Sequence, residues 1–125
     1  MLIGAVGGLI CFFAVAVMKN KLGYDDALDA FGVHGIGGTW GGIATGLFAQ
    51  KAINSAGADG LFFGGNLLGK QFIAIGATYV YAALATFVII SVIKMFMNIR
   101  AAEDEEEMGM DISCHGESAY KGITM

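Results

Sequence analysis

The feature that most constrains this chain is the spacing of its charged side chains, which leaves three long runs without any. Residues 1–18, 30–50 and 71–93 contain no Asp, Glu, Lys or Arg, and the third run stays apolar to residue 97 apart from one lysine. A helix needs about 20 apolar residues to cross a hydrocarbon core of about 30 Å. The sequence therefore predicts an all-α membrane protein with three transmembrane helices, at about 1–18, 30–50 and 71–97.

The charged residues divide the chain into an apolar body and an acidic C-terminal segment. Hydrophobic residues make up 56% of the chain and charged residues 14%, against averages of about 45–50% and about 25%. Residues 1–99 contain four acids and five bases, and residues 100–125 contain seven acids and two bases. We therefore expect a transmembrane region over 1–99 and a tail outside the membrane over 100–125. A net negative chain without a basic stripe is not expected to bind nucleic acid.

The basic residues around the apolar runs predict the orientation of the chain. Four of them flank the runs on one side and two on the other. Because cytoplasmic segments carry an excess of Lys and Arg, we expect the loop 19–29 and the tail in the cytoplasm. The run 1–18 has neither a basic start nor a signal-peptide cleavage site. Its abrupt apolar start indicates that the chain is part of a longer protein.

Glycine spacing in the second run predicts close helix packing. Gly38, Gly42 and Gly46 repeat every four residues, which places them on one helix face. Small residues on such a face let neighbouring backbones approach each other in a membrane. Flexible low-complexity sequence is the alternative, but a membrane segment must close its backbone hydrogen bonds. We therefore expect helices that pack inside a multi-span bundle.

One histidine, His34, lies within an apolar run. Ionisable groups inside a membrane are costly and usually face a cavity, a proton relay or a substrate path. A structural hydrogen bond to a neighbouring helix is the alternative, and the position of His34 leaves both open. A haem or metal protein is a further alternative, but Cys11 and Cys114 have no metal-ligand spacing. We expect no metal, no cofactor and no enzymatic activity.

Three acids, Asp25, Asp26 and Asp29, precede the second run. Asp is a good helix N-cap, and its charge is favourable at the positive end of the helix dipole. We therefore interpret these acids as helix caps, with cation attraction as the secondary interpretation.

The tail combines an acidic run with a less regular motif. Residues 103–107 are all acidic, and such a run is usually a solvated surface. The following segment, GMDISCHGESAY, contains Gly109, His115, Gly116 and Tyr120. This mixture predicts a tail that docks on a protein surface.

Two motifs now indicate a family. The segment DDALDAFGVHGIGGTWGGIATGLFA (residues 25–49) resembles the late signature of the Amt/MEP/Rh ammonium transporter family. The tail motif G-M-D-I-x-x-H-G-E-x-A-Y (residues 109–120) is similar to the tail of bacterial and archaeal members. The resemblance implies a helical bundle of about eleven spans that assembles as a homotrimer with one pore in each subunit. This chain then corresponds to the last three spans and the cytoplasmic C-terminal tail, in an inner or plasma membrane.

The resemblance also implies roles for residues of the second run. His34 corresponds to the second histidine of the twin-histidine pair that lines the pore, and Phe31 and Ala30 would face the inner vestibule. The family recruits ammonium outside, removes a proton and passes neutral ammonia along the pore. Its recruitment site, phenylalanine gate and first pore histidine belong to earlier helices, outside this chain.

For the tail, the resemblance implies regulation by a PII-type signalling protein, which inserts a loop into the cytoplasmic pore exit. The tail residues that match the family are Gly109, Asp111, His115, Gly116, Glu117 and Tyr120. The alternative function is a small helical membrane sensor or adaptor whose output is the acidic tail.

Overall fold

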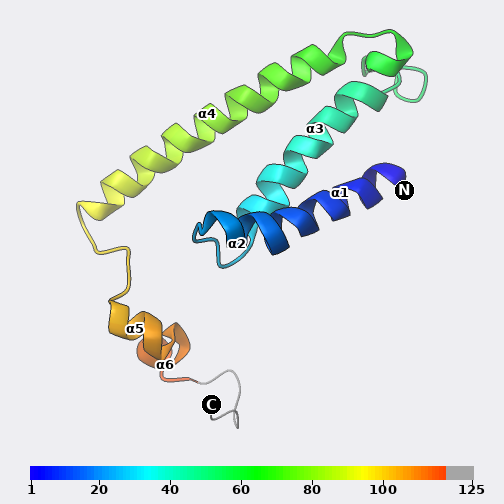
Figure 1. Ribbon diagram of the computed structural model, residues 1–125. Coiled ribbons are helices and arrows are strands. Elements are labelled where there is room, and N and C mark those ends of the chain that lie inside the picture. The colour runs from blue at the N-terminus through cyan, green and yellow to red at the C-terminus, as the bar shows by residue number, and fades with distance from the viewer. Residues whose placement is uncertain (118–125) are drawn as a thin grey trace. The chain divides into compact units, whose positions relative to one another are not determined.

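The computed structural model describes residues 1–117, and these residues form helices and turns with no strand among them (Figure 1). The chain divides into two compact units, Met1–Ala82 and Ala83–Met125. The helical elements are, in chain order, α1 (Leu2–Phe13), η1 (Ala14–Met18), α2 (Lys19–Leu22), η2 (Phe31–Ile36), α3 (Gly37–Phe48), η3 (Leu61–Phe63), α4 (Leu67–Lys94), α5 (Glu103–Met108) and α6 (Met110–His115).

The first helix runs without a break through α1, η1 and α2. Its sequence contains no proline, so no backbone donor is missing from the helix. The middle element, η1, is a wider π-helical turn. Gly23 ends the helix in the left-handed conformation, with φ of 64°. Glycine adopts this conformation without strain because it has no Cβ.

The second helix joins the π-helical turn η2 directly to α3, and α3 lies beside α1 (Figure 1). Glycines make this approach close. A Cβ on Gly7 would lie 3.2 Å from the ring of Trp40, and a Cβ on Gly37 would lie 2.7 Å from Sγ of Cys11. The indole nitrogen of Trp40 donates a hydrogen bond to the carbonyl of Ile3 at 3.0 Å. Trp40 therefore satisfies its polar atom inside the helix pair.

A loop of residues 49–66 connects α3 to α4. Gly60 donates its N–H to the carbonyl of Ala49 at 2.8 Å, and it lies so close to Leu47 that a Cβ would be 2.6 Å from that carbonyl oxygen. The rings of Phe48 and Phe62 are 5.1 Å apart. The loop is therefore folded back onto the end of α3.

Two helices of the described residues are long and apolar enough to cross a membrane: Leu2–Leu22, with 21 residues, and α4, with 28. The segment 31–48 is helical too, but its glycines make it less apolar than these two. The all-helical prediction is confirmed for residues 1–117. The count of three transmembrane spans stays a prediction.

The second unit contains two short helices, α5 and α6, which pack on each other. The acidic run opens α5, where negative charge is favourable at the helix N-terminus. The N–H of Ala102 donates to the carboxylate of Glu105 at 3.0 Å. Gly109, with φ of 92°, separates the two helices, and Gly116, with φ of 66°, ends α6.

Candidate functional site

His34 lies in η2, the π-helical turn at the start of the second helix. Its side chain is exposed in this chain, and within residues 1–117 it makes no hydrogen bond. Wide π-helical turns inside α-helices are uncommon and frequently occur at functional sites. Both ends of this turn are fixed by side chains from outside the turn.

Asp26 fixes the N-terminal end of the turn. Its two carboxylate oxygens accept the backbone N–H groups of Ala30 and Phe31, each at 2.9 Å. These N–H groups are among the four that a helix leaves unpaired at its start. Asp26 therefore acts as a cap from four residues before Ala30, whereas Asp25 makes no hydrogen bond within residues 1–117.

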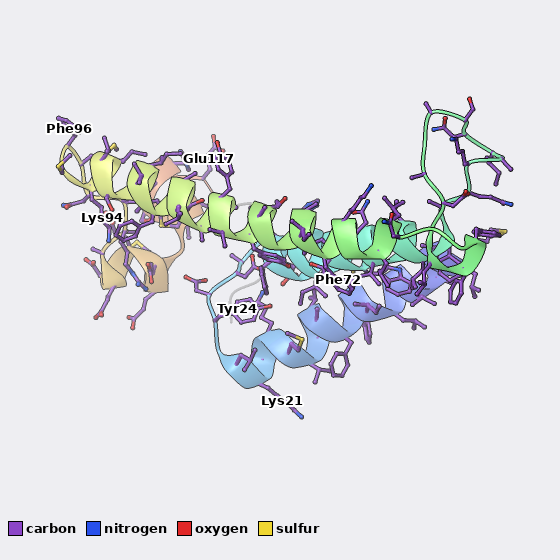
Figure 2. The ribbon with its side chains drawn as sticks, turned by 90° about the horizontal axis from the view of Figure 1, so that it is seen from above. Lys21, Tyr24, Phe72, Lys94, Phe96 and Glu117 are labelled. Atoms are coloured by element: carbon purple, nitrogen blue, oxygen red, sulfur yellow. The ribbon has the colours of Figure 1, made fainter. Side chains whose placement is uncertain are left out.

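Lys19 ties this end of the turn to the first helix. Its ammonium group donates to Asp29 at 2.7 Å and to the backbone carbonyl of Asp26. Asp29 has φ of 54°, the one positive value among non-glycine residues of the described chain. The neighbouring Lys21 points outward (Figure 2) and is exposed. The sequence does not single out Lys19 as a partner of Asp29, because Lys19 belongs to α2 and Asp29 to the following loop, and no spacing within one helix relates them.

Aromatic rings cover the same region. Tyr24 lies in the loop after α2 (Figure 2), and its ring meets the ring of Phe31 edge to face at a centroid distance of 5.9 Å. The hydroxyl of Tyr24 is buried without a hydrogen-bond partner within residues 1–117. The Phe31 ring also lies over Gly35, where a Cβ would be 2.9 Å from it. Ala30 is exposed.

The C-terminal end of the turn is fixed by hydroxyl groups. Thr39 and Tyr79 of α4 each place a hydroxyl oxygen within hydrogen-bond distance of the carbonyl of Gly35, at 2.8 and 3.0 Å. The two hydroxyl oxygens are 2.7 Å apart. Neither Tyr79 nor Gly35 stood out in the sequence. The available signal was the presence of hydroxyl groups in apolar runs, since these need a partner inside a membrane.

The predicted glycine face contacts α4 over part of its length. A Cβ on Gly42 would lie 2.9 Å from Ile75, and a Cβ on Gly46 would lie 2.7 Å from the Cα atom of Leu68. A Cβ on Gly38 would meet no neighbouring atom within 4 Å. The structure therefore brings Gly42 and Gly46 together with α4 but leaves Gly38 open.

The tail residues lie around the turn between α5 and α6. Gly109 occupies this turn, and its carbonyl accepts a hydrogen bond from Ser113 at 3.0 Å. Beyond His115 and Gly116, the N–H of Glu117 donates to the carbonyl of Asp111 at 3.0 Å. Tyr120 lies outside the described residues. Between residues 1 and 117 no group of three His, Cys, Asp or Glu side chains is placed to hold a metal ion.

Long apolar helices, packed through glycines and carrying hydrogen-bonded hydroxyl groups, define the class of helical membrane proteins. Comparison with known proteins makes this specific. The model of the Ammonium Transporter Family matches residues 1–120. The chain belongs to this family, and membership implies a location in a membrane.

Three relatives illustrate the similarity. An ammonium transporter of Bacillus subtilis (strain 168) is 59% identical over 122 residues, which cover 97% of this chain and 30% of the relative. An ammonium transporter of Aquifex aeolicus (strain VF5) is 44% identical over 119 residues, which cover 94% of this chain and 27% of the relative. Ammonium transporter 1 of Dictyostelium discoideum is 38% identical over 124 residues, which cover 98% of this chain and 27% of the relative. The chain therefore spans about 30% of the length of these relatives, and all three names describe transporters rather than enzymes.

Proposed function

We propose that this chain is part of a protein that moves ammonium or ammonia across a membrane. The observation that carries the proposal is His34, an imidazole without a partner in residues 1–117, held on a π-helical turn in a chain whose relatives are named ammonium transporters. In this proposal the chain is the C-terminal part of a bundle of about eleven spans that forms a homotrimer. Residues 1–99 supply three of the spans.

His34 would line the conduction path as one of two neighbouring imidazoles, with Phe31 and Ala30 on the side of the cytoplasmic vestibule. A neutral imidazole accepts a hydrogen bond at one nitrogen and donates at the other. It can therefore hold ammonia and take part in proton transfer beside it. Transfer of an unpaired ammonium ion through apolar walls is costly, which favours passage of the neutral molecule with the proton handled separately.

The tail over residues 100–125 would lie in the cytoplasm and regulate conduction. Support comes from the compact α5–α6 pair, in which Gly109 holds a backbone conformation that other residues rarely adopt. A solvated acidic appendage needs no such fold. A PII-type signalling protein is the proposed partner for this tail, and the lipid bilayer is the partner for the exposed apolar side chains of α4.

The test uses the complete protein in cells that lack ammonium uptake of their own. We expect His34→Ala to abolish methylammonium uptake or change its selectivity at normal membrane abundance, since the path loses an imidazole. Val33→Ala is the matched control, because Val33 is exposed in the same turn. Uptake by His34→Ala at the rate and selectivity of the unmodified protein would contradict the role in conduction.

A further inference from the structure

Three oxygen atoms form a closed cluster beside His34. They are the carbonyl of Gly35, the hydroxyl of Thr39 and the hydroxyl of Tyr79, separated by 2.8, 3.0 and 2.7 Å. Two of them belong to the second helix and the third to α4. Gly35 follows His34 directly in the chain and lies inside the same π-helical turn.

Proton counting shows how the cluster is bonded. Each hydroxyl carries one proton, and the carbonyl carries none. Two protons therefore serve three short contacts. One arrangement has Thr39 donating to Gly35 and Tyr79 donating to Thr39, and the other has Tyr79 donating to Gly35 and Thr39 donating to Tyr79. In both arrangements the carbonyl of Gly35 keeps a hydroxyl donor, and α4 stays bonded to the second helix.

The hydroxyl of Thr39 is a sufficient donor for the carbonyl of Gly35, so the hydroxyl of Tyr79 is not needed to satisfy that carbonyl. A hydroxyl that bonds back to the carbonyl four residues earlier is an ordinary feature of helices. Thr45, Thr78 and Ser91 make the same bond at 2.9, 2.8 and 2.7 Å. Within residues 1–117, the hydroxyl of Thr39 alone among these four has a second hydroxyl joined to it from another helix.

The location of the cluster indicates its role. The turn η2 is held at its start by Asp26, which binds the N–H groups of Ala30 and Phe31. It is held at its other end by the cluster at Gly35. π-helical turns are much rarer than α-helical ones. Contacts at both ends of η2 therefore keep its backbone in the wider register. His34 lies between the two anchors.

We propose that Tyr79 is a positioning residue for His34. By bonding from α4 to Gly35, or to Thr39 while Thr39 donates to Gly35, it keeps the π-helical register of η2 and thereby the direction of the imidazole. This inference rests on the proposed role of His34 in conduction. Tyr79 itself does not touch the transported molecule; it acts on the rate and on the pH dependence of transport through the orientation of His34.

The test compares Tyr79→Phe with Tyr81→Phe in the complete transporter, reconstituted in lipid vesicles. Phe keeps the ring and removes only the hydroxyl. Tyr81 is the matched control, because it lies on the same helix, is 75% exposed and makes no hydrogen bond among the described residues. We expect Tyr79→Phe to assemble normally, to slow methylammonium uptake about fivefold, as loss of one hydrogen bond predicts, and to shift the pH profile of uptake. Tyr81→Phe should match the unmodified protein in both.

A second measurement does not depend on transport. In protein labelled with ¹⁵N-histidine, the ring signal of His34 is the one that His34→Ala removes. Tyr79→Phe should move this signal, and Tyr81→Phe should leave it in place. Thr39→Val should also leave it close to its normal position, because Tyr79 can still donate to Gly35.

The outcomes separate the two proposals. An unmodified protein that carries no methylammonium would overturn the proposed function, whereas the ring signal would still test the positioning role. An unmoved ring signal in Tyr79→Phe would overturn that role, whatever the uptake rate. A loss of assembly in Tyr79→Phe would assign the cluster to helix packing and likewise overturn the positioning role.

Discussion

The ammonium nitrogen of Lys19 lies 2.7 Å from a carboxylate oxygen of Asp29, across the loop that joins the first helix to the second. Both side chains are partly buried, with exposed fractions of 26% and 35%. Asp29 holds a left-handed backbone conformation that a residue other than glycine rarely adopts. The ion pair, together with the hydrogen bond from Lys19 to the carbonyl of Asp26, therefore holds this unusual turn against the end of the first helix.

Replacing Lys19 should loosen the start of the second helix. We expect Lys19→Met to lower the unfolding temperature of the complete protein slightly, because partly exposed ion pairs contribute little. Protection of the Ala30 and Phe31 amides from hydrogen exchange should fall more clearly, since the neighbouring cap loses its support. Lys21→Met is the control, and equal protection in the two variants would show that the ion pair does not hold the turn.

Removal of the carboxylate of Asp26 should have a larger effect. Asp26→Ala leaves two N–H groups without their acceptor, and loss of a helix cap costs about 1 kcal/mol. Thermal unfolding in detergent measures this loss. Asp25→Ala, which removes no hydrogen bond of residues 1–117, should unfold like the unmodified protein. Equal unfolding temperatures for Asp26→Ala and Asp25→Ala would show that Asp26 does not cap the helix.

The glycines of the second helix should differ in their tolerance of a methyl group. Gly46→Ala should destabilise the protein by about 1–3 kcal/mol, because the new Cβ would lie 2.7 Å from the backbone of Leu68. Gly38→Ala should not reduce the stability of this helix pair, because its Cβ meets no atom within 4 Å. The yield of assembled protein in detergent compares the two. A lower yield for Gly38→Ala than for Gly46→Ala would contradict this packing.

These glycines show how far the sequence predicts the structure. Their four-residue spacing predicted one packing face, and Gly42 and Gly46 do lie against α4. The spacing alone could not show that Gly38 is left open, because the path of the neighbouring helix decides which part of a face is covered. Other glycines, Gly7 and Gly37, make the contact between the first two helices.

The candidate site was predictable only in part for a similar reason. An ionisable side chain is conspicuous in an apolar run, so His34 could be identified as a candidate from the sequence. Its anchors did not, because Tyr79 lies 44 residues from Gly35 and Lys19 lies 10 from Asp29. Such pairs depend on how the helices meet, which periodicity within one helix does not encode. The π-helical register of residues 31–36 has no sequence signal either.

In the tail, the conformation of Gly109 gives a further prediction. Its φ of 92° strains any residue with a side chain. We expect Gly109→Asp to disrupt the turn between α5 and α6 and to reduce transport in all three subunits of the proposed trimer. Glu106→Gln should have little effect, because its contact with Arg100 is long, at 3.4 Å, and exposed. Uptake at matched membrane abundance compares them, and equal, unreduced rates would show that the tail is only solvated.

The length of α4 constrains the membrane that can hold it. Its 28 residues extend about 42 Å at about 1.5 Å per residue, well beyond a hydrocarbon core of about 30 Å. Lys70 and Lys94 lie 24 residues apart, a separation of about 36 Å. In the proposed transmembrane orientation this separation would place one ammonium group in each headgroup layer. In that orientation the helix would fit a thicker bilayer with less tilt and would have to tilt further in a thinner one. Bilayer thickness would then act on the tilt of α4 and, through the hydroxyl of Tyr79, on its contact with the second helix.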